Sequence, residues 1–171
     1  MDDRFTAGFI AGVFGGTAAN AWGLFSGAIG FTSLRFVDWA GIMTFGHRPP
    51  FSSGEIFFAL VTNIGLCGVL GIFFVFLITQ ITSKNLSLKG LIFAESAWFF
   101  FYSVSILFKV DGIAPLPLAT CISDFIAAAI FGLVQAYVLQ KLAVASSIRH
   151  TPAMVPALKQ FDPEDDDNHK K

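Results

Sequence analysis

Four long stretches of the chain are almost free of charged residues, and this feature limits the fold more than any other. No Asp, Glu, Lys or Arg occurs in 5–34 or 56–83, and a single acid interrupts each of 90–108 and 112–140. A helix needs about 20 apolar residues to cross a bilayer. Because lipid offers no hydrogen-bond partner to the backbone, such a segment must be helical. The pattern predicts an all-α membrane protein with four transmembrane helices in a bundle.

The composition agrees with lipid as the main surrounding of this chain. Only 13% of its 171 residues are charged and 54% are hydrophobic, whereas soluble domains carry about 25% charged residues. The formal net charge is −1, so no basic excess favours a nucleic-acid partner. Membrane lipid is the partner that this composition predicts.

The polar and proline-containing segments between the apolar runs set the helix limits. We expect spans near 5–31, 56–81, 88–108 and 115–141. Pro49 and Pro50 block a continuous helix, and the segment from Ser52 to Glu55 resembles a capping box that opens the second span. The mixed segment from Leu34 to His47 predicts a short interfacial helix between the first and second spans, with a structured loop as the alternative.

The chain divides into a transmembrane domain, 1–142, and a polar, acidic tail, 143–171. The tail cannot bury enough apolar surface to fold alone, so we expect it to be disordered. Basic residues are more numerous on the side of the termini (Arg4, Lys84, Lys89, Lys141, Arg149, Lys159) than on the other side (Arg35, Arg48, Lys109). This bias predicts a multi-pass protein of the plasma membrane with both termini in the cytoplasm.

Glycine recurs at helical spacing in the first span. Gly8, Gly12 and Gly16 are four residues apart, as are Gly23 and Gly27, so each set shares one helix face. Small residues let helix backbones approach closely, which stabilises helix pairs in lipid. We interpret these glycines as a helix-packing face that contacts another helix of the chain, a second copy or another membrane protein. A helix that slides or hinges is the alternative.

A candidate site is formed by polar residues inside the predicted spans: Asn20, Asn63, Glu95, Thr120 and Asp124. At a rise of 1.5 Å per residue, Asn20, Asn63 and Asp124 should share one layer, with Glu95 about one turn below. A charged Asp costs about 2.5–3.5 kcal/mol at the centre of a span. No Lys or Arg inside a span can pair with these acids, so we expect neutral, hydrogen-bonded carboxyls. The expected partners of Asp124 are Asn20, Asn63 and Thr120.

Catalytic and metal-binding signatures are absent from the sequence. It contains no HExxH, GxSxG or P-loop pattern. Cys67 and Cys121 lie in apolar runs without a CxxC or a Cys/His cluster, so we interpret both as small packing residues. We therefore predict no enzyme activity, no cofactor and no metal site.

Three sequence features together resemble a known group of proteins. The segment from Gly30 to Ala40 reads GFTSLRFVDWA and follows the glycine-rich span, and the segment from Leu88 to Gly90 precedes a span that contains Trp98. Over 4–142 the chain looks like a family of small, uncharacterised four-span membrane proteins of spore-forming Gram-positive bacteria. The resemblance implies a bacterial cytoplasmic membrane. The family motifs carry no defined chemistry, so no activity or site residue follows from them.

Two functions are compatible with these residues. The first is a non-enzymatic packing, assembly or scaffold component that acts through helix contacts. The second is a small transporter or channel subunit in which Glu95 and Asp124 handle protons or cations, since acids inside a membrane are functional candidates. Mutual pairing of the polar groups would favour the first, and a cavity that contains both acids would favour the second.

Overall fold

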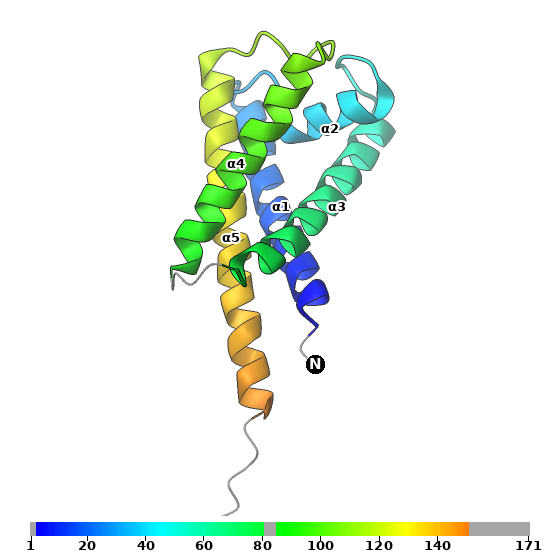
Figure 1. Ribbon diagram of the computed structural model, residues 1–171. Helices are drawn as coiled ribbons and strands as arrows, with labels where there is room; N and C mark the ends of the chain where they lie inside the picture. Colours follow the sequence, from blue (N-terminus) through cyan, green and yellow to red (C-terminus); the bar gives the residue numbers. More distant parts are fainter. Residues whose placement is uncertain (1–2, 81–84, 151–171) are drawn as a thin grey trace, which may run out of the picture.

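The computed structural model describes residues 3–80 and 85–150, with side chains as far as Leu142, and every regular element in these ranges is a helix. The elements are α1 (Arg4–Ala28), α2 (Phe36–Phe45), α3 (Ser53–Ile78), α4 (Leu86–Leu107) and α5 (Leu118–His150). In Figure 1 the four long helices run between two ends of the molecule, and α2 lies across one of these ends. We call this the α2 end, and the opposite end, which holds the start of α1, the terminal end.

Three of the long helices are apolar enough to cross a bilayer: α3, α4 and the Leu118–Leu142 part of α5. The expected all-α class and the short helix after the first long one are confirmed, but the expected four apolar spans are corrected to three. Helix α1 has 25 residues, which is long enough to span. Its glycines and alanines, together with Asn20 and Ser26, lower its mean hydropathy.

Helix α1 packs on other helices with one face, whereas Phe14 and Phe25 on its other face are more than half exposed. It packs along α3 and along α5, and Figure 1 shows it between them. Its buried residues are mostly small: Gly8, Ala11, Gly12, Gly15, Gly16, Ala19, Asn20, Gly23 and Ser26. Small residues on this face permit close backbone approach to the neighbouring helices. The small residues of the packed face therefore explain why α1 is the least apolar of the long helices.

Helix α2 is short and largely buried. Its backbone begins where the Arg35 amide donates to Asp38 Oδ2 at 2.9 Å, and it ends at Gly46, whose φ of 73° is the left-handed conformation that glycine adopts readily. Val37 and Ile42 are each only 2% exposed, and α2 packs mainly on α3. It therefore forms part of the protein core at the α2 end.

Polar groups fix the limits of the other helices. Ser52 and Glu55 form the predicted capping box of α3, with the Ser52 amide donating to Glu55 Oε2 at 2.7 Å. Arg48 pairs with Asp111, which joins the loop before α3 to the loop before α5. Helix α5 extends past the boundary expected at 142 as far as His150. The remainder of the predicted tail, 151–171, lies outside the described residues.

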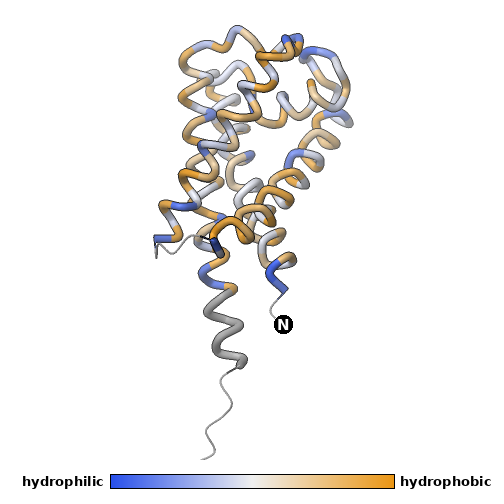
Figure 2. Tube along the Cα trace, viewed as in Figure 1, coloured by the Kyte–Doolittle hydropathy of each residue, from blue (hydrophilic) through white to orange (hydrophobic). Residues whose placement is uncertain are grey.

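The outer surface of the long helices is apolar. Large exposed side chains include Phe57, Phe73, Phe76, Phe99 and Phe100, each more than half exposed. Figure 2 shows hydrophobic segments through the middle of the bundle and hydrophilic segments at its two ends. Three helices that could span a bilayer, with phenylalanine on their outer faces, are typical of a multi-pass membrane protein.

Candidate functional site: a cavity between α3 and α4

A cavity lies where α3 and α4 diverge. The two helices make few contacts with each other, whereas each packs closely on another helix. The cavity has a volume of about 70 Å³. All five helices contribute to its wall: Ala19, Phe36, Trp39, Asn63, Leu66, Cys67, Leu70, Ala94, Ala97, Trp98, Phe101, Tyr102, Ala128 and Phe131.

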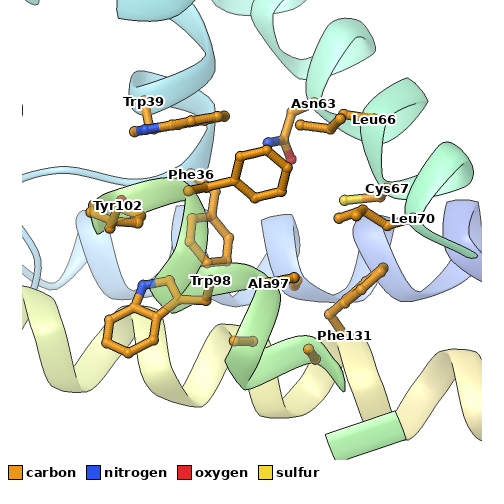
Figure 3. A pocket seen from close by; sticks show the side chains of 14 residues that line it. Phe36, Trp39, Asn63, Leu66, Cys67, Leu70, Ala97, Trp98, Tyr102 and Phe131 are labelled. Atoms are coloured by element: carbon orange, nitrogen blue, oxygen red, sulfur yellow. The ribbon is translucent and has the colours of Figure 1, made fainter. Parts of the chain in front are cut away.

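Aromatic rings form the wall at the α2 end of the cavity. The Trp39 ring lies 5.8 Å from Phe101 and 6.3 Å from Tyr102, and Tyr102 lies 6.0 Å from Trp98. Trp39 Nε1 donates to Ser105 Oγ at 3.1 Å, which ties α2 to α4. Figure 3 shows Phe36 among these rings, pointing toward the side of Asn63. Helix α2 thereby closes one end of the gap between α3 and α4.

Asn63 is the polar side chain of α3 in this wall, and Asn20 of α1 holds it. Asn20 Nδ2 donates to Asn63 Oδ1 at 2.7 Å and to the Gly16 carbonyl at 2.8 Å. Both side chains are buried, at 4% and 6% exposed. Two residues of the candidate site therefore meet, as their equal predicted depth indicates.

Asp124 lies deep in the bundle, but its neighbours differ from those expected. Asn20 and Asn63 pair with each other, and Thr120 bonds to Ser33 at 3.0 Å. The Tyr102 hydroxyl is near enough to the Asp124 carboxyl to interact electrostatically, although the pair lacks hydrogen-bond geometry. Asp124 Oδ2 has no hydrogen-bond partner among the described residues.

Glu95 is separated from Asp124. The residue of α4 that lies near Asp124 is Tyr102. Tyr102 is seven residues after Glu95, so the two residues are about 10 Å apart along the helix. Both carboxyl oxygens of Glu95 are covered by protein and have no hydrogen-bond partner in the described part of the chain. Neither acid belongs to the wall of the cavity.

Other polar groups form a seam between α1 and α5 near the α2 end. Ser26 and Ser123 share a hydrogen bond of 2.7 Å, and Trp22 Nε1 donates to the Ser123 carbonyl at 3.1 Å. Further along α5, Gln135 is fully buried, and neither end of its amide has a partner within residues 3–80 and 85–142. The interior thus contains both paired and unpaired polar groups.

The glycines of α1 lie against different elements. A Cβ on Gly8 would stand 2.8 Å from the Gly71 carbonyl oxygen of α3, and one on Gly16 would stand 2.8 Å from Cys67 Sγ. A Cβ on Gly27 would meet the Arg35 side chain at 2.8 Å, whereas Gly23 would meet only Arg35 Cβ at 3.8 Å. The face formed by Gly8, Gly12 and Gly16 therefore packs inside the chain.

Charged groups gather in the loops of the α2 end, outside the spans. His47 Nε2 lies 3.1 Å from Glu55 Oε1, and Nδ1 lies 2.9 Å from the Arg48 carbonyl. These contacts, the one to Arg48 first, raise the pKa of His47 above its ordinary value of 6.5. The Arg48 guanidinium lowers the pKa of the Asp111 carboxyl by bonding to it. A second hollow here is bordered by Arg35 and Asp38, which pair at 2.7 Å.

The cavity was not part of the site expected from the sequence. The sequence pattern places Trp98 and Tyr102 on one helix face with Glu95. The contacts of Tyr102 with Phe36 and Trp39, however, form only because α2 folds back toward α4. Only the abundance of aromatic residues, 15% of the chain, could have indicated an aromatic wall. The comparisons add no relative to these observations: no family model, no curated protein and no solved structure matches the chain.

Proposed function

We propose that this chain is a non-enzymatic, four-span membrane protein that binds an apolar molecule from the surrounding bilayer. The cavity between α3 and α4 is the observation that carries the proposal. Its wall contains no charged side chain and is dominated by aromatic and aliphatic groups. Apolar pockets with few polar groups are the usual form of small-molecule sites.

The apolar outer faces of α3 and α4 support lipid as the source of the bound molecule. Phe73 and Phe76 of α3 and Phe99 and Phe100 of α4 are exposed on the outer surface. In a bilayer these faces contact hydrocarbon, so the gap between the two helices opens to lipid chains rather than to water. A lipid chain that enters this gap exchanges one apolar surrounding for another and gains dispersion contacts with the rings.

The transport hypothesis receives less support. It requires Glu95 and Asp124 to face one water-accessible cavity, and neither carboxyl lines the cavity between α3 and α4. The glycine face of α1 is also not free to bind a second protein, because Gly8, Gly12 and Gly16 lie against α3. A binding role that uses the interior of the bundle accounts better for the described contacts.

The proposal includes α1 as the fourth span and both termini in the cytoplasm. Helix α1 has the length to cross the bilayer beside α3 and α5, and Figure 1 places the start of α1 and the later part of α5 toward the same end. Thiol labelling tests this in a chain that lacks Cys67 and Cys121. Ser52→Cys should react with a membrane-impermeant maleimide from outside intact cells, and Ser147→Cys should not.

Photolabelling tests the binding role. The purified full-length protein in phosphatidylcholine nanodiscs is illuminated with a diazirine-bearing hexadecane, and labelled residues are located by mass spectrometry. We expect labels on the cavity wall, and Ala97→Phe should remove most of them because Ala97 lines the space. Ser96→Phe is the matched control, since Ser96 is exposed on the same helix. Equal labelling of the wall in both variants would refute the proposed site.

A further inference from the structure

The hydrogen bonds of Asn20 determine which end of the Asn63 amide faces the cavity. The Gly16 carbonyl can only accept, so the Asn20 atom that contacts it at 2.8 Å must be the amide nitrogen. The same nitrogen contacts Asn63 at 2.7 Å, so the Asn63 atom in that bond must be the oxygen. The remaining end of Asn63 is therefore its nitrogen, a donor only.

This nitrogen has no hydrogen bond to any described residue, and Asn63 is only 6% exposed. Asn63 belongs to the wall of the cavity, and Figure 3 shows its side chain projecting into the space with the nitrogen on the side of Phe36. A donor in an apolar surrounding is costly unless an acceptor meets it. The acceptor must come from a molecule inside the cavity.

We propose that the cavity binds an uncharged lipid whose chain carries an oxygen acceptor, a carbonyl or a hydroxyl, that accepts a hydrogen bond from Asn63 Nδ2. The inference rests on the proposed function and specifies the chemistry of its ligand. Asn20 acts as a positioning residue, because its bond to Asn63 turns the donor toward the ligand.

The wall excludes charged lipid groups. Among the described residues, no Lys, Arg, His, Asp or Glu belongs to it, so neither an anionic nor a cationic group would find a counter-charge there. Charge buried without a partner is far more costly than a buried neutral polar group. Asn63 is the tenth residue after Ser53, the first residue of α3, which corresponds to about 15 Å along the helix. A phospholipid headgroup would stay at the surface, whereas a carbonyl or hydroxyl on an otherwise apolar chain could reach this depth.

Competition against the diazirine-bearing hexadecane tests this choice of ligand. The competitors are hexadecane, hexadecan-2-one, hexadecanoate and hexadecyltrimethylammonium, each added to the full-length protein in nanodiscs. We expect hexadecan-2-one to displace the label about threefold to tenfold better than hexadecane, the gain of one neutral hydrogen bond. The two charged competitors should displace it no better than hexadecane.

Asn63→Leu should remove the advantage of hexadecan-2-one, so that it and hexadecane displace the label equally in that variant. Asn20→Leu combined with Asn63→Leu repeats the test without stranding the Asn20 amide. Equal displacement by hexadecane and hexadecan-2-one in the parent would overturn this inference while the binding role stands, and so would stronger displacement by a charged competitor. Failure of every competitor, with labelling unaffected by Ala97→Phe, would instead refute the proposed function.

Discussion

Helix α3 contacts two of its neighbours, α1 and α4, in opposite ways. On one side Gly68 and Gly71 lie directly against α1, so that a Cβ on Gly71 would stand 2.8 Å from Gly12 Cα. On the other side Leu66 and Leu70 face α4 across a cavity of about 70 Å³. Small residues permit backbone contact, whereas large and irregular side chains hold helices apart and leave space. One helix can therefore supply both a rigid interface and a binding wall.

The largest expected effect is at the glycine interface. Gly12→Leu should prevent folding or lower stability by about 1–3 kcal/mol or more, because a Cβ there would already stand 2.9 Å from Gly68 Cα. Thermal unfolding and yield after purification measure the effect. Gly65→Leu is the control on α3, since a Cβ at Gly65 meets nothing within 4 Å. Parent-like unfolding of the Gly12 variant would show that the two interfaces do not differ as described.

Substitutions of Asp124 test whether the stability of the bundle depends on a charged or a neutral carboxyl group. Asp124→Asn keeps shape and hydrogen-bonding capacity, so stability should be nearly unchanged. Asp124→Ala should lower stability by about 1 kcal/mol or more, since it leaves a cavity where the buried carboxyl stood. Unfolding of the two variants across pH 5–9, with and without added cations, provides the measurement. A pH- or cation-dependent shift in the parent that Asp124→Asn abolishes would favour the transport hypothesis instead.

Filling the gap between α3 and α4 should increase stability, whereas the substitutions above decrease it. Ala97→Leu places apolar atoms in the existing space and should raise the free energy of unfolding by about 1 kcal/mol. Thermal unfolding of the delipidated protein is the measurement, with Ser96→Leu on the lipid-facing side as the control. If Ala97→Leu destabilises as strongly as Gly12→Leu, the gap is packed as tightly as the glycine interface.

The smallest expected effect concerns the exposed loop before α3. Because the pKa of His47 is raised in the fold, protonated His47 adds stability below about pH 6.5. This stability is lost as pH rises through the higher pKa of the folded state. The melting temperature of the parent should fall slightly above pH 6.5, and His47→Gln should remove that fall. Identical pH profiles for both proteins would argue against the contact of His47 with Glu55.

Local rules predicted several elements correctly. The capping box at Ser52 and Glu55 starts α3, and the mixed segment after the first helix contains α2. Asn20 and Asn63 lie in one layer, as their depth predicted, but they bond to each other and not to Asp124 as expected. The prediction was wrong for the number of apolar spans, because a stretch without charged residues can still be rich in glycine and alanine, as α1 is.

The sequence by itself determined the helical class, the membrane as solvent and the small-residue face of α1, because these depend on local composition and on the 3.6-residue period. Only the tertiary structure decided that Asp124 lies near Tyr102, that Glu95 stands apart and that Asn63 borders a cavity. Those facts depend on helix crossing and on α2 folding across one end. Both result from packing between residues distant in sequence, such as Trp39 with Ser105, and no local pattern encodes them.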